Sequence, residues 1–396
     1  MTVETDAEEL DPGTAFLFKA FEPANRQDPY GLYAATREAQ PILDAGFGMW
    51  FTFSHGAAHS LLRSRTTSSD ERRSNEFQAN VATDPRLQAH AATEPLMLFT
   101  DPPDHARLRG LVSRAFTPRT VEKMRPRLET LAAELLDSID GAGPVDFVER
   151  IAYPFPVTVI CELLGIPLAD IPLFESMSHD LTLMIEPGTL RTEEQEDAIV
   201  AAREDLSAYI SDLLNVRRKK PGDDLISGLL AARDGEDRLS EPELVSMVIL
   251  LLLAGHETTV NLIGNGLVAL LRHPDELARW HADPTLSLNA VDELTRYDSP
   301  VQMAMRVLLE PTEVEGFTLP AGDQVITLLG SANRDPAVFT DPDRLDLSRP
   351  NAHANVSFGG GIHHCLGMAL ARTEAEIMLV VSLSEWVFVS RSTNQR

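Results

Sequence analysis

The chain of 396 residues contains only two cysteines, Cys161 and Cys365. Two cysteines cannot build the disulfide framework of a small secreted protein, so the composition favours a reducing environment such as the cytoplasm. Cys161 lies in the apolar stretch 157–164, where we expect an inert core thiol. Cys365 lies among glycines, which favour a loop.

Positive charge and long apolar runs are also scarce. The sequence has 34 Lys and Arg against 60 Asp and Glu, a net charge of −26, so we expect neither nucleic acid nor an anionic membrane among its partners. The longest apolar run, 247–254, is far shorter than the roughly 20 residues that span a bilayer. The acidic start MTVETDAEE is unlike a signal peptide. We predict a cytoplasmic monomer without a membrane anchor.

Hydrophobic residues make up 43% of the chain, enough for a large core. We predict a flexible acidic lead-in over 1–27 and a single domain over 28–396, in which the C-terminus 379–396 is atypically short. Apolar periodicity predicts a mainly α protein with small β-sheets. Helices are expected over 28–39, 105–115, 118–140, 145–164, 170–185, 192–218, 223–233, 241–272, 274–282, 287–298 and 367–380. Strands are expected within 42–53, 303–309 and 317–328, and residues 64–95 as a loop with short helical pieces.

The segment FGGGIHHCLG at 358–367 surrounds Cys365 with glycines. Glycines let a backbone approach a flat, bulky ligand, and a cysteine thiolate is a strong metal ligand. Phe358 supplies an apolar cover, and Gly367 lets the next helix begin close to that ligand. One alternative is a buried cysteine in a Gly-rich turn. Another is a zinc site built from His353, His363, His364 and Cys365, although the adjacent pair His364–Cys365 suits tetrahedral coordination poorly.

The spacing F-x-x-G-x-H-x-C-x-G resembles the haem-binding loop of the cytochromes P450, the haem-thiolate monooxygenases. The resemblance covers about residues 28–378 and implies the cytochrome P450 fold. It implies that haem b binds with Cys365 as the axial iron ligand, in contact with Phe358, Gly359, His363 and Gly367. Thiolate donation to iron favours cleavage of the O–O bond.

The same resemblance implies an activity and partners. One oxygen atom of O2 is inserted into an apolar small organic substrate, by hydroxylation or epoxidation. Electrons come ultimately from NAD(P)H, through a reductase and a ferredoxin or flavodoxin-type donor.

Residues 241–272 are the longest and most apolar expected helix, and its middle reads AGHETT at 254–259. A carboxylate inside an apolar helix is costly unless it is solvated or functional. The Thr258 hydroxyl can bond to the carbonyl of Ala254 and locally widen the helix. The motif resembles A-G-x-[DE]-T of the cytochromes P450, which implies that Glu257 and Thr258 deliver protons during oxygen activation and that Ala254 lies against the haem. His256 is expected to serve structure. The alternative is that Glu257 and Thr258 simply face solvent.

Two further spacings resemble family motifs. Glu293 and Arg296 match E-x-x-R, which locks the core behind the haem loop, with Arg349 or Asn351 as its third partner; taken alone, such a pair is a solvated ion pair worth about 0.2–0.5 kcal/mol. The second spacing, H-x-x-x-R, places His105 and Arg109 on one helix face and resembles the family's clamp on the haem propionates. Arg306 and His363 match further propionate contacts of the family. The alternative for all four is ordinary surface charge.

Residues 102–127 hold seven Lys and Arg but only two acids. Such a patch would steer an acidic electron carrier, unless its charges pair within the fold. The family's layout implies an apolar, adaptable substrate pocket, although the same residue types also build cores. Its residues are Leu98, Met184, Leu253, Val301 and Met303.

Few residues follow Cys365, and the resemblance fades after Ile377. The segment 386–389 is expected to form one short strand, with no return strand after it. One alternative function is therefore a C-terminally truncated haem protein that is weakly active or inactive. Another is a peroxide-driven haem enzyme, against which the intact Glu257–Thr258 pair argues.

Overall fold

The computed structural model describes residues 12–20, 22–139, 144–174, 183, 192–232 and 239–393. It is mainly α-helical with small sheets, as predicted. The chain folds into two compact units. Unit 1 comprises 1–93, 295–345 and 349–365, and unit 2 comprises 94–294, 346–348 and 366–396. The single domain expected over 28–396 stays a prediction.

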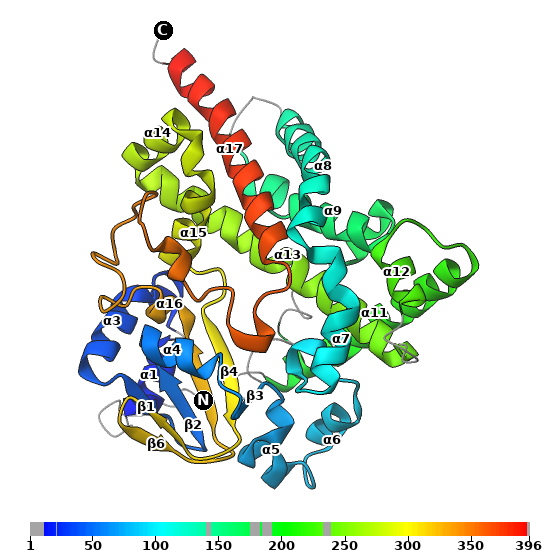
Figure 1. Ribbon diagram of the computed structural model, residues 1–396, viewed down its shortest axis with the longest axis vertical. Helices are drawn as coiled ribbons and strands as arrows, with labels where there is room; N and C mark the ends of the chain where they lie inside the picture. Colours follow the sequence, from blue (N-terminus) through cyan, green and yellow to red (C-terminus); the bar gives the residue numbers. More distant parts are fainter. Residues whose placement is uncertain are drawn as a thin grey trace. The chain divides into compact units, whose positions relative to one another are not determined.

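A five-stranded sheet organises unit 1, in the order β1-β2-β7-β4-β3 (Figure 1). β2 and β7 run parallel, and the other neighbours are antiparallel. A second sheet pairs β5 with β6. The expected strand 317–328 is thus two strands, because Gly322, at φ +81°, turns the chain between them. The strands are Ile42–Asp44 (β1), Met49–Thr52 (β2), Thr67–Ser68 (β3), Met303–Leu308 (β4), Thr312–Val314 (β5), Phe317–Leu319 (β6) and Gln324–Leu328 (β7).

Helices cover both faces of the five-stranded sheet, because side chains alternate along each strand. Phe51 of β2 packs with the first helices on one face, and Val325 of β7 packs with Leu61 on the other. The helices of unit 1 are α1 (Pro12–Ala20), α2 (Pro23–Gln27), α3 (Tyr30–Ala39), α4 (His55–Leu61), α5 (Asn75–Asn80), α6 (Pro85–Ala92) and α16 (Leu329–Ala332).

The expected lead-in is wrong for the segment 12–27, which forms α1 and α2. Phe16 of α1 is buried among aromatic rings, with ring centroids 5.2 Å from Phe51 and 5.0 Å from Phe53. Burying one such ring stabilises a fold by roughly 1.5–3 kcal/mol. Together with Leu17 and Ala20, which pack against the same cluster, Phe16 ties α1 to the sheet, although the acidic sequence before it resembles a free tail.

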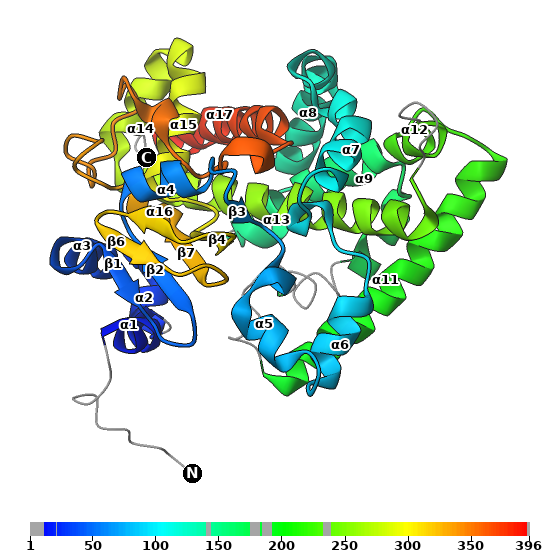
Figure 2. The same ribbon diagram turned by 60° about the horizontal axis from the view of Figure 1, so that its bottom comes forward.

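α13 is the central helix of unit 2 and packs against α9, α11 and α17, while α17 also packs against α8 (Figure 2). It begins with a capping box between Ser240 and Glu243. By composition α13 is long and apolar enough to cross a membrane, but 67% of its apolar window is buried inside the structure. The main helices of this unit are α7 (Asp104–Val112), α8 (Pro118–Asp137), α9 (Pro154–Leu164), α11 (Glu193–Lys219), α12 (Leu225–Ala231), α13 (Glu241–Arg272), α14 (Pro274–Ala282), α15 (Ser287–Tyr297, whose end belongs to unit 1) and α17 (Met368–Thr393).

Two expected elements differ. The helix over 145–164 is interrupted: a π-helical turn, η4 (Val148–Ala152), precedes α9, which begins at Pro154. Proline lacks the N–H that would continue the preceding hydrogen-bond ladder. The strand expected at 386–389 is wrong, because α17 continues as a helix to Thr393. The helix expected over 170–185 lies largely outside the described residues.

Candidate active site

Cys365 is exposed at the end of a tightly closed loop in unit 1. Its backbone N–H donates to the carbonyl oxygen of Phe358 at 2.8 Å. Gly359 and Gly361 have φ values of +70° and +64°, a backbone that favours glycine. A Cβ on Gly361 would lie 2.6 Å from the carbonyl oxygen of Leu62, so a side chain there would force the loop to shift. The loop therefore presents the Cys365 thiol from a fixed frame.

The two cysteines differ in environment as the sequence predicts. Cys161 is buried in α9, and burial raises the pKa of its thiol to about 12, so it stays protonated. The zinc alternative is without support, since no group of three or more metal-binding side chains gathers among the described residues. At Gly367 a Cβ would meet no protein atom within 4 Å. An accessible thiol and open space after it in the chain fit a thiolate-ligated haem.

The polar motif of α13 has the hydrogen bond that the sequence predicts. The Thr258 hydroxyl donates to the carbonyl oxygen of Ala254 at 3.1 Å. The helix remains α-helical throughout, so the expected widening is not accompanied by a change of helix type. Ala254 is exposed although the residues before it are buried, and Glu257 is half-buried. This stretch of a core helix is thus left uncovered where the motif lies.

Gly255, within the same motif, is required by packing. A Cβ at this position would lie 2.9 Å from Cδ1 of Ile160 on α9. The sequence shows a glycine here but does not reveal its partner, because α9 and α13 are far apart in the chain. The close contact fixes where α13 crosses α9, and therefore fixes the position of the motif within unit 2.

The predicted propionate contacts are divided between the units: His105 and Arg109 belong to unit 2, and Arg306 and His363 to unit 1. His105 is buried in α7, and burial together with the nearby charge of Arg109 lowers the pKa of its imidazole. A neutral imidazole beside a guanidinium offers hydrogen-bond donors to an anion. Arg306 is largely buried on β4, where its side chain donates to the carbonyl oxygen of Met305 at 2.7 Å.

The E-x-x-R residues are buried, so the solvated ion pair is the wrong alternative. Glu293 accepts a hydrogen bond from the backbone N–H of Asp346 at 3.0 Å. The Arg296 guanidinium is 0% exposed and donates to three backbone carbonyls, which belong to Asn333, Pro342 and Arg344.

Of the two candidate third partners, Arg349 is the better placed. It donates to the Arg344 carbonyl at 2.8 Å, the same acceptor that Arg296 uses. The side chain of Asn351 donates instead to the carbonyl of Val338 at 2.9 Å.

A buried carboxyl on α17 was not predicted. Glu374 is 1% exposed, and within the described part of the chain neither carboxyl oxygen makes a hydrogen bond of good geometry. Burial raises the pKa of Glu374 well above its usual range, an effect that the nearby Thr259 hydroxyl partly offsets. Its helical spacing from Leu370 and Met378, both buried, is the signal that would have placed it on the inner face.

Much of the basic segment 102–127 pairs within the fold, as the alternative interpretation predicts. Arg107 pairs with Glu243, Arg125 with Glu376 at 2.9 Å, and Arg127 with Glu162 at 2.7 Å. Three exposed cations make no ion pair within 4 Å among the described residues, and we name them the basic patch: Arg114, Arg119 and Lys123.

The predicted substrate residues have mixed surroundings. Leu253 of α13 is buried and Leu98, in the short helix η2 (Met97–Phe99), is half-buried, both in unit 2. In unit 1, Val301 and Met303 pack against buried apolar clusters. Met184 lies outside the described residues. Their role in substrate binding stays a prediction.

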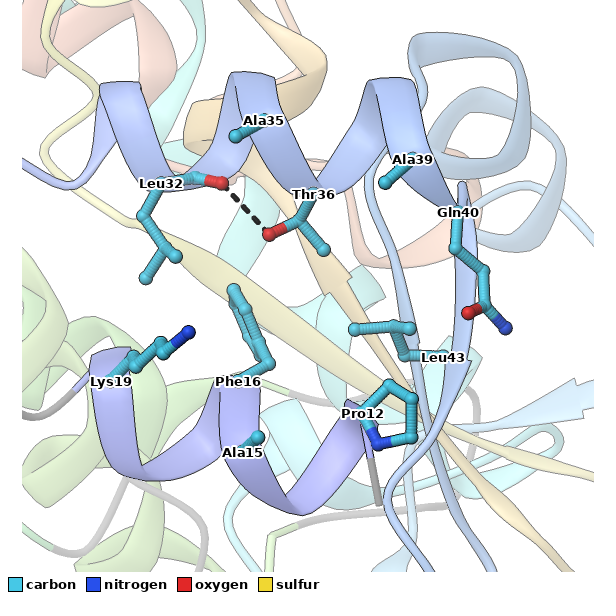
Figure 3. A pocket seen from close by; sticks show the side chains of 10 residues that line it. All are labelled: Pro12, Ala15, Phe16, Lys19, Leu32, Ala35, Thr36, Ala39, Gln40 and Leu43. Atoms are coloured by element: carbon cyan, nitrogen blue, oxygen red, sulfur yellow. Dashed lines mark hydrogen bonds between the residues drawn. The ribbon is translucent and has the colours of Figure 1, made fainter. Parts of the chain in front are cut away.

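A pocket of about 320 Å³ lies between α1 and α3 of unit 1 (Figure 3). Its lining is mostly apolar, with Phe16, Leu32 and Leu43 pointing inward and Lys19 at one end. None of the ten residues that line it is a predicted site residue. It therefore plays no part in the candidate active site.

The comparisons with known proteins agree on one family. The cytochrome P450 family model matches residues 72–283 and 285–395. The vitamin D(3) 25-hydroxylase of Pseudonocardia autotrophica is 41% identical over 379 residues, 91% of this chain and 90% of that protein. The 6-deoxyerythronolide B hydroxylase of Saccharopolyspora erythraea is 41% identical over 361 residues, 89% of this chain and 87% of that protein. Ligand-free CYP164A2 of Mycobacterium smegmatis superposes with a TM-score of 0.86 at 36% identity and covers 94% of this chain and 93% of that one. The chain therefore belongs to the cytochrome P450 family of haem monooxygenases.

Proposed function

We propose that this protein is an O2-dependent hydroxylase or epoxidase in which Cys365 ligates the haem iron and Glu257 and Thr258 deliver protons. One observation carries the proposal: of the two cysteines, the exposed one is the thiol in the closed glycine loop. An exposed thiol in such a loop is accessible to a metal, whereas the thiol of Cys161 is buried in α9.

The remaining motif residues have roles that their surroundings support. Bound haem supplies the redox chemistry of oxygen activation. His105 and Arg109 on α7, with Arg306 and His363, would hold the propionates through charge-assisted hydrogen bonds. Thr258, with its hydroxyl oriented by the Ala254 carbonyl, and the half-buried Glu257 would hold and pass protons at the stretch of α13 that is left uncovered.

The substrate we propose is a bulky, largely apolar organic molecule. Two relatives carry names that point to such substrates, a vitamin D(3) 25-hydroxylase and a 6-deoxyerythronolide B hydroxylase. Electrons would come from NAD(P)H through a reductase and an acidic ferredoxin or flavodoxin-type donor, and the protein would work in the cytoplasm as a monomer.

Replacing Thr258 with alanine should uncouple electron use from product formation. Haem binding and substrate-induced spectral shifts should stay within about twofold of wild type, because the hydrogen bond that this hydroxyl makes within the described residues is to its own helix. Product per NAD(P)H should fall by roughly tenfold or more, in the range that general acid catalysis contributes, while hydrogen peroxide release rises. The measurement is the ratio of product and peroxide to NAD(P)H consumed.

Thr258→Ser is the matched control, because it keeps the hydroxyl, and it should retain most of the coupling. Unchanged coupling in Thr258→Ala would remove Thr258 from proton delivery. If hydrogen peroxide alone supports wild-type turnover as fast as NAD(P)H, reductase and ferredoxin do, the result would instead favour a peroxide-driven enzyme.

Electron delivery should depend on the basic patch. Charge reversal at Arg119 or Lys123 should slow first-electron transfer from an acidic ferredoxin by several-fold at low salt. That loss should shrink as salt rises, because the screening length is only about 8 Å at 0.15 M. Lys220→Glu, an exposed cation beyond α11 in the same unit, is the control and should reduce normally. If the stopped-flow reduction rate changes neither with salt concentration nor with charge reversal, the basic patch is excluded as a docking site.

A further inference from the structure

The segment 298–302 joins α15 to β4 in unit 1. It contains Val301 and leads into Met303, both predicted to contact substrate. Ser299 of this segment is 1% exposed. Its Oγ lies 2.7 Å from the carbonyl oxygen of Val301 and 2.9 Å from Oγ of Ser357. Ser357 directly precedes the cysteine loop. One buried hydroxyl therefore joins the predicted substrate segment to the start of the loop.

Ser357 is itself held in place by other elements. Asn333, the buried residue that ends α16, donates from its amide to Ser357 Oγ at 2.7 Å. The amide oxygen of Asn333 accepts from the backbone N–H of Val356 at 2.8 Å. Ser357 Oγ also lies 2.9 Å from the carbonyl oxygen of Thr295 on α15. Val356 belongs to a buried apolar cluster against which Val301 packs. Ser357 is thus a fixed point beside the segment.

The backbone of Ser299 is fixed by a residue from the other end of the chain. The Tyr30 hydroxyl, at the start of α3, accepts from the N–H of Ser299 at 3.1 Å and donates to Oδ1 of Asp298 at 2.7 Å. Burial raises the pKa of Tyr30 well above its ordinary value, so this hydroxyl keeps its hydrogen at neutral pH. Pro300 follows and disfavours helical backbone at Ser299. The freedom left to Ser299 is mainly the direction of its own hydroxyl hydrogen.

The number of hydrogens limits what the two serines can do. Each hydroxyl carries one hydrogen, and a carbonyl only accepts. Ser299 and Ser357 therefore supply two hydrogens for three contacts. These contacts are the one between the two hydroxyls and those with the carbonyls of Val301 and Thr295. When the hydroxyls bond to each other, one hydrogen is left for one of the two carbonyls. The Val301 carbonyl is thus held in only one of two arrangements.

We propose that Ser299 is a positioning residue whose hydrogen bond to Ser357 sets the distance between the substrate segment and the cysteine loop. This inference rests on the proposed haem site and on the predicted role of Val301 in substrate binding. Buried, connected hydrogen bonds of this kind hold one arrangement of neighbouring segments. Because the Val301 carbonyl can be released while the two hydroxyls stay bonded, the segment can adjust to a bulky ligand. The bond should matter for ligands that reach the segment, and not for ligands that reach only the iron.

The first experiment compares two iron ligands on the full-length holoprotein by spectral titration. Imidazole reaches only the iron, whereas clotrimazole carries bulky aromatic rings on its imidazole. Ser299→Ala should weaken clotrimazole by about threefold to tenfold, because the released segment must be ordered again on binding. Imidazole should stay within about twofold of wild type. The control is Ser331→Ala, since this buried hydroxyl on α16 bonds to Arg37. It should lower the melting temperature and leave the ratio of the two dissociation constants unchanged.

The second experiment breaks the same bond from the other side. Ser357→Ala should also weaken clotrimazole selectively, and it carries the test alone if Ser299→Ala does not fold. In a double-mutant cycle, the loss in the double variant should be clearly smaller than the product of the two single losses, because one bond is removed in each case. Losses that multiply, or a ratio that does not change in either single variant, would overturn the positioning role. A wild type without a thiolate-type carbon monoxide spectrum would overturn the proposed function as well.

Discussion

Replacing Cys365 with serine should abolish the absorption shift that marks a thiolate-ligated ferrous carbon monoxide complex. A serine hydroxyl is not a thiolate and donates far less electron density to iron, so monooxygenase turnover should fall by at least about a thousandfold, equivalent to roughly 4 kcal/mol. The fold should persist, because the backbone bond from residue 365 to the Phe358 carbonyl does not involve the side chain. The measurements are the reduced carbon monoxide difference spectrum and the far-ultraviolet circular dichroism.

Cys161→Ser is the matched control, and it should preserve the thiolate spectrum. Because Cys161 is buried in α9, we expect this change to lower the free energy of unfolding by about 1–3 kcal/mol, since it buries a hydroxyl without a hydrogen-bond partner. The ligand assignment fails if the two variants exchange behaviour, with the spectrum lost in Cys161→Ser and kept in Cys365→Ser.

Replacing Glu374 with glutamine should stabilise the protein, and the gain should grow with pH. The folded state holds Glu374 protonated because burial raises its pKa, whereas the unfolded chain ionises near 4.5. The contribution of this carboxyl is therefore fully present below pH 4.5 and is lost as pH rises toward the folded pKa. Across that window the unfolding equilibrium of wild type worsens about tenfold per pH unit relative to the glutamine variant.

The measurement is the difference in free energy of unfolding between wild type and Glu374→Gln, from denaturant titrations at several pH values. The two proteins should agree near pH 4 and diverge above it. Glu376→Gln is the control on the same helix: it removes a carboxylate that pairs with Arg125, so it should bring no gain that grows with pH. A constant difference for Glu374→Gln would show that this carboxyl ionises within the fold.

The sequence predicted best where local chemistry fixes the outcome. The bounds of α13 follow from its Ser240 cap and its apolar periodicity, and they agree with the expected 241–272. The Thr258–Ala254 hydrogen bond follows from helical spacing alone. The contrast between Cys161 and Cys365 follows from an apolar segment and a glycine-rich one.

Packing between distant segments was beyond prediction. One contact that holds α1 in place is Phe16 against Phe51 of strand β2, which no local pattern reveals. Burial of Glu293 and Arg296 depends on backbone carbonyls and N–H groups from residues 333–346. The α-helix over 386–389 shows the opposite failure, because short β-branched and aromatic runs suit either structure and the preceding helix decides.

The parallel pairing of β2 with β7 has a consequence for synthesis of the chain. Met49 pairs with Gln324, so the β1–β2 hairpin leaves the ribosome long before its neighbouring strand exists. Until then β2 presents an open edge, and such edges recruit other chains. The nascent protein must keep this hairpin shielded or unformed through most of translation. Slow synthesis at low temperature, or abundant chaperones, should therefore raise the soluble yield. The gain should exceed that from substitutions near β7, the last strand of the sheet in chain order.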